Sequence, residues 1–470
     1  MRRTKIVCTL GPASNTKEKI AELVRAGMNC ARLNFSHGDH ESHARMANLV
    51  RETAREARKP MAILADMQGP KMRIGKFAAG PIELAPGDRF ALTTNDVGGN
   101  QEIVSVIHDS IAADLAPGDT VALDDGFIRL RVERIEDQTV HTIVEDGGVL
   151  SDHKGLNLPG VSVTGPALTA KDRKDLAFAI SPDIAADYIA LSFVRSADDV
   201  REAKDLAGDV PVIAKIERPE AVEALPEILD ATDGIMIARG DLGVELGAEK
   251  VPLVQKRIIR ETNARGKVVI TATQMLDSMI RHPRPTRAEA ADVANAVMDG
   301  TDAVMLSGET AAGRYPTQAV AMMDAIIREV ESDYVEDLAR EFGELQNVGD
   351  EDWPFSNAAA RAAAVLTAHL PLKAVVVFTH DGRSAGLLAE HRPKSPIVAV
   401  TSDIRVARRL ALEWGVIPRI EVPPESLDET LRIATSLLMR EKLCKTGEAF
   451  AMVVGWPTSG RTNTLKLHRL

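Results

Sequence analysis

The 470-residue chain carries a formal net charge of −11, and 45% of its residues are hydrophobic while only 3% are aromatic. A chain of this length exceeds one compact core, so we expect two to four domains built largely from aliphatic residues. The charge disfavours general binding to nucleic acid or anionic membranes, and three cysteines (Cys8, Cys30 and Cys444) are too few for a disulfide framework. Neither a signal-peptide pattern nor an apolar run of membrane-helix length is found, so we expect a cytoplasmic protein.

Eight short apolar or β-branched runs, mostly separated by one helix-like stretch, predict strands that alternate with helices. The runs are residues 5–10, 30–35, 62–66, 188–194, 212–217, 234–239, 268–273 and 303–307. Helix-like stretches include 16–26, 219–229 and 251–265. The helix after the seventh run opens with Thr286 and, three residues later, Glu289, the pattern of a capping box. This alternation predicts a TIM (β/α)8 barrel in two parts, residues 1–69 and 165–342.

Residues 70–164 interrupt the alternation between the third and fourth strands. Turns such as Pro86-Gly87 and Asp125-Gly126 separate short alternating runs such as 127–132, which predicts an all-β domain inserted at a barrel loop. A polar stretch, 343–352, follows the barrel. Beyond it, four strand-like runs at 374–378, 397–400, 417–422 and 450–454 alternate with helical stretches and predict a separate α/β domain over residues 343–470.

Polar side chains end seven of the predicted barrel strands, where TIM barrels carry their active sites. Since residues two apart share a strand face, we expect these side chains to line the mouth: Arg32, Asn34, Ser36, Asp66, Ser192, Lys215, Glu217, Arg239, Asp241, Thr271, Thr273, Ser307 and Glu309. Any one of them is equally well explained as a polar cap at the solvent boundary. Together they form a ring of charges that stabilises nothing unless a ligand or metal balances it.

Glu217 and Asp241 end adjacent predicted strands and suit a hard divalent cation. Magnesium takes one or two protein carboxylates and completes its shell with substrate oxygens and water. The alternative is that these carboxylates only form salt bridges, to Lys215 and Arg239. With a metal present, Lys215 would be a point charge for a transferring phosphoryl group, and the amide of Gly240 could hold a carboxylate.

Several longer segments resemble signature motifs of the pyruvate kinase family. They include Ala-Arg-Leu-Asn-Phe-Ser-His-Gly (31–38), Ile-Ala-Lys-Ile-Glu-Arg (213–218), Ala-Arg-Gly-Asp-Leu-Gly-Val-Glu (238–245), and the segments 4–14, 271–276 and 283–311. The resemblance spans the whole chain in the family's domain order: barrel, inserted β lid, barrel, C-terminal regulatory domain. It implies phosphate transfer from phosphoenolpyruvate to ADP, giving pyruvate and ATP in the last step of glycolysis. It further implies a magnesium or manganese cofactor and a homotetramer.

The resemblance also implies roles for matching residues. Arg32 would hold the transferring phosphate, and Lys215 would stabilise the phosphoryl group and the developing enolate. Glu217 and Asp241 would bind the metal. The substrate carboxylate would be held by Gly240, Asp241 and Thr273.

Further roles concern the proton and the nucleotide. Thr273, through water linked to Ser307 and Glu309, would help to protonate the enolate carbon. The nucleotide would contact Asn34, Arg73 in the hinge to the lid and Lys154 in the lid, and would be flanked by Pro12 and His37.

The segment after the third strand departs from the family's commoner pattern. Potassium-dependent members typically have Asp-Thr-Lys-Gly-Pro-Glu, whereas this chain has Asp-Met-Gln-Gly-Pro-Lys at residues 66–71. The threonine and the glutamate are replaced by Met67 and Lys71. This weakens the case for a monovalent-cation site at Asn34, Ser36 and Asp66. We expect Lys71, reaching toward Asp66, to supply the positive charge instead, so that potassium is not required.

A candidate phosphate site lies in the C-terminal domain. Thr379, Gly382, Arg383 and Ser384 follow a predicted strand and open a helix, where backbone amides and hydroxyls suit a phosphate. With a tail loop at 457–464, this segment resembles the family's sugar-phosphate effector pocket. The alternative is an ordinary capped helix start.

Two rival functions stay open at this point. One is a magnesium-dependent lyase or aldolase of the phosphoenolpyruvate/pyruvate barrel type, in which a Glu–Asp pair also binds the metal. The inserted domain, Arg73 and Lys154 argue against it, because an aldolase needs no nucleotide lid. The other rival is a catalytically silent sugar-phosphate sensor, which the intact Lys215 and Thr273 disfavour.

Overall fold

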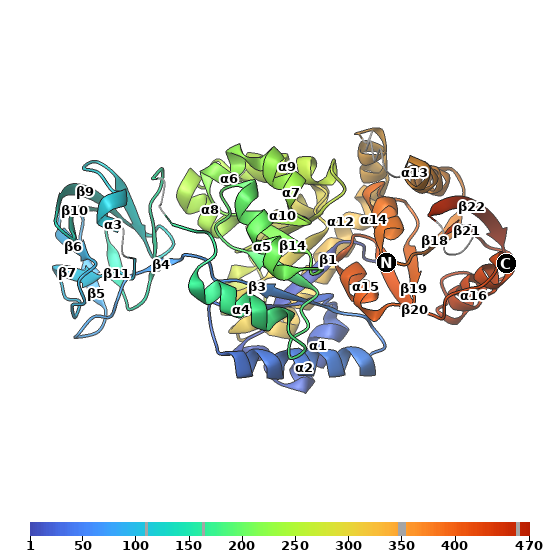
Figure 1. The fold of residues 1–470 in the computed structure, drawn as a ribbon, viewed down its shortest axis with the longest axis horizontal. Coiled ribbons are helices and arrows are strands. Elements are labelled where there is room, and N and C mark those ends of the chain that lie inside the picture. The colour runs from blue at the N-terminus through green and yellow to red at the C-terminus, as the bar shows by residue number, and fades with distance from the viewer. Residues whose placement is uncertain (109–110, 162–164, 346–353, 457–460) are drawn as a thin grey trace.

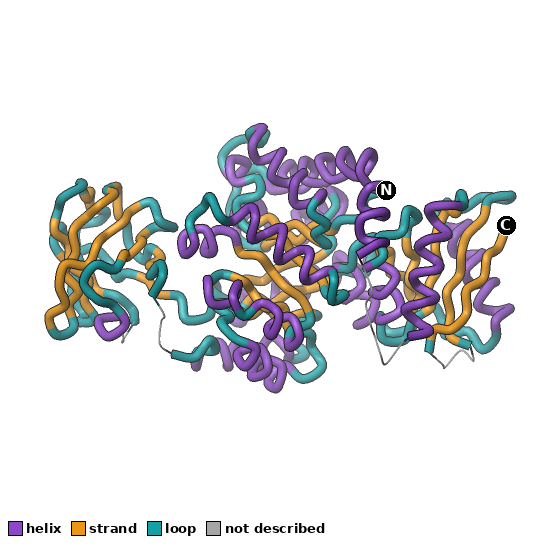
Figure 2. The backbone as a smooth tube through the Cα atoms, turned by 90° about the horizontal axis from the view of Figure 1, so that it is seen from above, coloured by secondary structure: helices purple, strands orange, loops and turns teal. Residues whose placement is uncertain are grey.

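Three bodies lie in a row in the computed structural model, which describes all residues except 109–110, 162–164, 346–353 and 457–460. A β-rich domain occupies one end, a barrel surrounded by helices the middle, and an α/β domain the other end (Figure 1). The same row is seen from above (Figure 2), with helices around the strands of the central body.

All eight predicted barrel strands are present and close into one parallel barrel in the order β1-β17-β16-β15-β14-β13-β3-β2. The strands are β1 (Lys5–Thr9), β2 (Cys30–Asn34), β3 (Ala62–Asp66), β13 (Tyr188–Leu191), β14 (Val212–Ile216), β15 (Gly234–Ala238), β16 (Val268–Ala272) and β17 (Ala303–Leu306). Their residues are buried almost throughout, as expected where helices cover the outer face of a parallel sheet. The predicted TIM barrel is therefore confirmed.

Helices surround the barrel. They are α1 (Lys17–Ala26), α2 (His40–Glu56), α4 (Ala170–Ile180), α5 (Ala197–Ala207), α6 (Pro219–Glu223), α7 (Leu225–Ala231), α8 (Arg239–Leu246), α9 (Val251–Asn263), α10 (Arg287–Met298), α11 (Gly308–Ala311) and α12 (Pro316–Leu345), with 3-10 turns η1 (Pro12–Ser14) and η2 (Asp277–Ile280). The capping box of α10 is confirmed: the Thr286 hydroxyl accepts the Glu289 N–H at 3.2 Å, and the Glu289 carboxylate accepts the Thr286 N–H at 2.7 Å. The single helix predicted at 219–229 is wrong. Pro226 lies in the first turn of α7, where its missing N–H costs nothing, and so begins a second helix.

Two apolar layers hold the barrel together. One packs between strands and helices, and the other fills the interior with residues such as Val7, Leu64 and Met236. The interior cluster includes Leu412 of the C-terminal domain, which closes the end opposite the mouth. Cys8 and Cys30 are fully buried, and burial raises the pKa of both thiols, so they are core residues as expected.

The stretch between β3 and α4 forms the inserted β domain. Its elements are β4 (Met72–Arg73), β5 (Ile82–Leu84), β6 (Arg89–Thr93), β7 (Ile103–Ser105), α3 (Ile111–Asp114), β8 (Thr120–Leu123), β9 (Ile128–Glu136), β10 (Thr139–Asp146), β11 (Gly148–Leu150) and β12 (Gly155–Asn157). Seven strands pair in the order β4-β12-β8-β9-β10-β6-β7, and β11 pairs with β5. The one-turn helix α3 is the departure from an all-β domain.

The C-terminal domain is a five-stranded sheet, β20-β19-β18-β21-β22, with an apolar cluster on each face. Its elements are α13 (Pro354–His369), β18 (Leu372–Phe378), α14 (Arg383–Glu390), β19 (Ile397–Thr401), α15 (Ile404–Arg409), η3 (Leu410–Leu412), β20 (Val416–Ile420), α16 (Leu427–Arg440), β21 (Ala449–Gly455) and β22 (Thr462–Arg469). Within the expected tail loop 457–464, residues 457–460 lie outside the described part, and Thr462 already begins β22. This antiparallel edge strand is mostly polar, so no apolar run marks it in the sequence.

The predicted domain boundaries stay predictions. Helix α12 continues to Leu345, past the boundary expected at 342/343, and residues 346–353 are not described. Among the described helices, none combines the length and apolar character needed to cross a membrane.

Candidate active site at the barrel mouth

Arg32 and Lys215 converge on one buried carboxylate at the mouth. Arg32 Nε lies 2.6 Å from Asp66 Oδ2, and Lys215 Nζ lies 3.2 Å from Asp66 Oδ1. The neighbouring strands β2 and β3 set this arrangement. Asn34 pairs with Asp66 in register, and Arg32 lies two residues before Asn34 on the same face of β2. Both Asp66 oxygens are thereby engaged, and the two cations keep its pKa lowered in spite of its burial.

Lys215 is held by three oxygen-bearing side chains. Its Nζ lies 2.9 Å from Glu217 Oε1 and donates to Ser192 Oγ at 2.6 Å, in addition to its contact with Asp66. Burial alone would lower the pKa of Lys215, but the carboxylates of Asp66 and Glu217 raise it to about 12. Lys215 therefore stays a cation near neutral pH, an electrostatic group and not a general base.

Glu217 and Asp241 form an electrostatically unfavourable pair in the described structure. Burial raises the pKa of Glu217, and the nearby Asp241 carboxylate raises it further. The other Glu217 oxygen accepts the Phe193 N–H at 2.8 Å. The salt-bridge alternative thus holds for Glu217, but Lys215 also serves Asp66, so a divalent cation between the two carboxylates would relieve their repulsion. No group of three or more potential ligands among His, Cys, Asp and Glu is found in the described residues.

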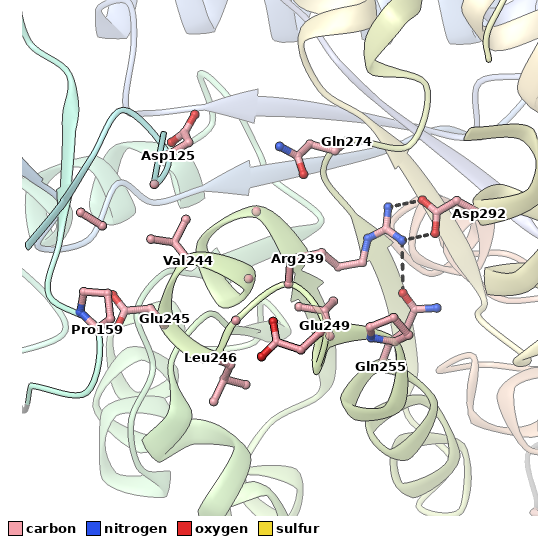
Figure 3. A pocket seen from close by; sticks show the side chains of 18 of the residues that line it. Asp125, Pro159, Arg239, Val244, Glu245, Leu246, Glu249, Gln255, Gln274 and Asp292 are labelled. Carbon is pink, nitrogen blue, oxygen red and sulfur yellow. Dashed lines mark hydrogen bonds and ion pairs between the residues drawn. The ribbon is translucent and has the colours of Figure 1, made fainter. Parts of the chain in front are cut away.

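Arg239 and Asp241 do not share a strand face as predicted. β15 ends at Ala238, and helix α8 begins at once with Arg239, so the two-residue periodicity no longer applies. Arg239 turns away from Asp241 and pairs with Asp292 of α10 at 2.6 Å (Figure 3). Asp241 is therefore not neutralised by Arg239.

Lys71 contacts Asp241 and not Asp66, which corrects the expected direction of its side chain. Lys71 Nζ lies 3.3 Å from Asp241 Oδ1. Asp66 is already occupied by Arg32 and Lys215. Lys71, which lies between β3 and β4, thus reaches one of the two candidate metal ligands.

Thr273 lies in a strained backbone conformation after β16. Its φ is +66° and that of Gln274 is +55°, values that are rare for a β-branched or other side-chain-bearing residue. The Thr273 hydroxyl accepts the Gly240 N–H at 2.7 Å and donates to the Ala272 carbonyl at 2.7 Å. The amide predicted to hold a substrate carboxylate is therefore engaged by Thr273 here.

Glu309 acts as an anchor for two loops at the mouth. It lies in α11 and accepts the Leu276 N–H at 3.1 Å and the Ser307 N–H at 2.7 Å. Burial raises its pKa. Thr271 lies on the same face of β16 as Val269, toward the surrounding helices and not toward the mouth as predicted, and its hydroxyl bonds Thr301 Oγ1 at 3.0 Å. Glu309 thus fixes the segment after Thr273.

The residues expected at the nucleotide site lie on both sides of the hinge. Ser36 is in the turn beyond β2, with its N–H bonded to Asn34 Oδ1 at 3.1 Å. The pKa of His37 is lowered by desolvation and then by Arg73, Arg32 and Lys71, which marks a cationic neighbourhood. Pro12 opens the 3-10 turn η1 that follows β1.

Two lid-side cations are held by the inserted domain itself. Arg73 Nη1 donates to the His153 carbonyl at 2.9 Å, and Lys154 Nζ lies 2.6 Å from Asp124 Oδ1. β4 and β12 pair side by side and bring these two cations to the same edge of the lid.

Two hydroxyl residues hold Arg32 and Lys215 in place, and the sequence pattern indicated neither of these contacts. The Thr9 hydroxyl accepts from Arg32 Nη1 at 2.9 Å, and Ser192 accepts from Lys215 while donating to the Met67 carbonyl at 2.7 Å. The sequence signal for Thr9 is weak, because it is a single hydroxyl at the end of an apolar strand. Ser192 is among the polar residues predicted at the mouth, but its contact with Lys215 depends on which strands are neighbours in the barrel.

A cavity of about 1170 Å³ opens beside this site, between the inserted domain and α8 (Figure 3). Asp125 of the inserted domain faces it from one side, and Val244 and Glu249 from the barrel side. Gly240 and Gln274 border it, so it adjoins the substrate residues.

The predicted effector residues divide between two cavities. Thr379 and Ser384 line a cavity of about 570 Å³ in the C-terminal domain, together with Arg461. Gly382 is the N-cap of α14 with φ +94°, and its N–H donates to Thr379 Oγ1 at 3.0 Å. Arg383 instead lines a separate cavity between this domain and the barrel, because it lies on the other side of α14.

A closed parallel barrel with two buried cations beside a carboxylate pair defines an enzyme that acts on an anionic substrate. A family model described as the pyruvate kinase barrel domain matches residues 1–320, and one described as the pyruvate kinase alpha/beta domain matches residues 357–468. The chain belongs to the pyruvate kinase family. It is a phosphotransferase, and the family implies dependence on a divalent cation.

Curated relatives match along the full chain. The chain is 46% identical to the pyruvate kinase of Geobacillus stearothermophilus, covering 99% of this chain and 80% of the relative. It is 46% identical to the pyruvate kinase of Mycobacterium intracellulare, covering 100% and 98%. It is 40% identical to the pyruvate kinase of Clostridium perfringens, and the match covers 100% of this chain and 100% of the relative. These matches favour a phosphotransferase over the lyase or aldolase and over a silent sensor.

Proposed function

We propose that the chain transfers the phosphoryl group of phosphoenolpyruvate to ADP, giving pyruvate and ATP in glycolysis. The observation that carries this proposal is Lys215, a permanent cation held between Asp66 and Glu217 in the barrel mouth. Phosphoryl transfer needs positioned positive charge more than covalent help. Formation of ATP and pyruvate from the two substrates tests it.

We propose Mg²⁺, or Mn²⁺ in its place, as the divalent cation, held by Glu217 and Asp241. The repulsion between these carboxylates and the incomplete ligand set fit a cation whose remaining positions are taken by substrate oxygens and water. When bound, the cation supplies positive charge to the oxygens of the substrate.

The protein side chains then have distinct tasks. Arg32, braced by Asp66 and Thr9, presents its remaining N–H groups to the phosphate. Lys215 stabilises the negative charge that develops on the enolate oxygen. Thr273, with Gly240 and Asp241, would hold the substrate carboxylate once its hydroxyl releases the Gly240 N–H. That hydroxyl would then pass a proton to the enolate carbon through water linked to Ser307 and Glu309.

We assign the nucleotide to the cleft between the barrel and the inserted domain. Arg73 and His37 lie in the cationic neighbourhood described above, and we assign Asn34 on β2 and Lys154 beside β12 as further contacts of the nucleotide. Polyphosphate binding would draw Lys154 away from Asp124 as the lid closes. A cytoplasmic homotetramer is proposed from the family alone.

We propose that potassium is not required. Lys71 places an ammonium beside Asp241, and both oxygens of Asp66 are occupied by Arg32 and Lys215. A fixed cation at this position offsets the negative charge of substrate, nucleotide and carboxylates. The Ser36 N–H donates to Asn34 Oδ1 at 3.1 Å, so this Asn34 oxygen already has a partner without an ion.

We propose that a sugar phosphate activates the enzyme through the C-terminal cavity lined by Thr379 and Ser384, with Gly382 and Arg383 at the adjoining start of α14. The Ser384 hydroxyl lies 2.6 Å from Thr462 Oγ1, so two hydroxyls meet in the cavity wall. Arg461 lines the same wall. The N-terminus of α14 adds backbone N–H groups suited to a phosphate.

The double substitution Arg383→Ala with Ser384→Ala is expected to abolish activation while leaving turnover at saturating phosphoenolpyruvate unchanged. Effector coupling is typically worth about 5- to 150-fold, so it appears as a shift in half-saturation. Several sugar phosphates are first tested on the unmodified enzyme by activity and calorimetry. The single variants then separate the residues, since Arg383 lines the neighbouring cavity. If no sugar phosphate binds, the effector proposal fails.

A further inference from the structure

A second cavity, of about 520 Å³, lies at the seam between the barrel and the C-terminal domain. It is formed by the end of α2 and the start of β3 on one side and by α15, β20 and α16 on the other. It therefore lies at the barrel end opposite the mouth, where the two bodies adjoin (Figure 1). Seven cationic side chains line it: Arg51, Arg55, Arg58, Lys59, Arg408, Arg419 and Arg440.

Carboxylates balance three of these cations. The ion pairs are Arg51–Asp187, Arg419–Glu441 and Arg440–Glu421. Glu441 is the acidic residue within the lining. No ion pair is found within the described part of the chain for Arg55, Arg58, Lys59 or Arg408, so the cavity holds a net positive charge.

The unbalanced cations also crowd one another. Burial, together with Arg51 and Arg55, lowers the pKa of Arg408 in spite of the nearby Asp187 and Asp403. Burial, together with Arg2, lowers the pKa of Lys59 to about 8 in spite of Asp324, and the hydrogen bond found for the Lys59 ammonium among the described residues is to the Met28 carbonyl, at 3.0 Å. In a chain of net charge −11, a concave surface of this kind is stabilised by an anion.

The lining also indicates what kind of anion fits. Guanidinium groups match the oxygens of a phosphate in bidentate geometry, and a dianion balances more of the excess charge than a single carboxylate does. Ala54, Met61, Ile404 and Ile420 add an apolar wall, and the volume suits a small organic molecule. We propose that this cavity binds a small phosphate monoester, at a site separate from both the active site and the effector cavity at Thr379.

Such a ligand would connect the two bodies. Arg55 and Arg58 belong to the barrel, and Arg408 belongs to the C-terminal domain. The loop that carries Arg58 leads directly into β3, whose far end holds Asp66. Binding at the seam therefore stabilises the docked arrangement and raises the melting temperature of the whole chain.

The test compares two charge-matched double variants of the full-length protein. Arg55→Gln with Arg408→Gln removes two unpaired cations from the cavity. Arg45→Gln with Arg405→Gln removes two arginines from the same helices, α2 and α15, at positions outside the lining. Circular dichroism checks the fold, and Arg58→Gln, at an exposed position, is a milder second variant.

Calorimetry is performed without divalent metal, using ribose 5-phosphate and adenosine 5′-monophosphate, with ribose and adenosine as controls. The unmodified protein and the control variant are expected to bind a monoester, while the cavity variant binds it about tenfold or more weakly. The monoester that binds shows whether a sugar phosphate or a nucleotide is the preferred source. Thr379→Val should leave this binding unchanged.

Two results would overturn the proposal. One is that neither monoester binds the unmodified protein. The other is that the cavity variant and Arg58→Gln bind with the affinity and stoichiometry of the unmodified protein, which would place the phosphate elsewhere.

Discussion

Replacing Lys215 with methionine is expected to reduce turnover by about 100- to 1,000-fold or more, the usual loss when a preorganised charge at a developing anion is removed. Lys215 is 9% exposed and fully charged at neutral pH, so neither water nor another side chain takes its place at the enolate oxygen. The loss should appear in turnover more than in the half-saturation for substrate, because the charge is needed most in the transition state.

The control is Lys174→Met, at an exposed position on α4. Lys215→Met removes a partner from Asp66 and Glu217, so its fold and its binding of Mn²⁺ are checked by circular dichroism and calorimetry. Both should be largely retained, since Arg32 still pairs with Asp66. A folded variant that keeps a tenth of the original turnover would refute the role of Lys215.

The enzyme is expected to work with tetramethylammonium as the sole monovalent cation and to gain little from added potassium chloride. Lys71 already supplies positive charge 3.3 Å from Asp241. A missing cation in such a site typically costs on the order of 100-fold, so activation by potassium of about tenfold or more would contradict the proposal.

Lys71→Glu is expected to lose most activity in potassium-free buffer, because it puts a carboxylate beside the candidate metal ligand Asp241. Potassium should restore part of the activity. Recovery stays incomplete, since the Met67 side chain offers no oxygen ligand. Lys76→Glu makes the same charge change at an exposed position of the inserted domain and should leave turnover unchanged. Equal losses in the two variants would show that net charge, not the Asp241 contact, is responsible.

The fold could be predicted wherever burial leaves a recognisable pattern of apolar residues along the sequence. The barrel strands are covered on both faces, so each appears as a short, mostly apolar run, such as residues 6–8 in β1. Edge strand β22 alternates polar residues and was missed. A single helix was predicted over 219–229, and the break between α6 and α7 was missed, because Pro226 is compatible with the first turn of a new helix.

The candidate site was predictable in its membership but not in its contacts. Strand order brings Arg32, Asp66, Lys215 and Glu217 together, and all four were named from the sequence. The turn from β15 into α8 directs Arg239 to Asp292, which no periodicity could indicate. The partner of Lys71 likewise depends on the path of the chain between β3 and β4, beside the barrel mouth.

Phosphoryl transfer to ADP is tested most directly by measuring pyruvate and ATP together in one reaction of the purified protein with phosphoenolpyruvate, ADP and Mg²⁺. Equal amounts of both products are expected, none of either when ADP is omitted, and none when EDTA removes the divalent cation. Pyruvate released without ADP would instead indicate hydrolysis or lyase chemistry, and no product under any condition would contradict the assignment of Lys215, Glu217 and Asp241 to phosphoryl transfer.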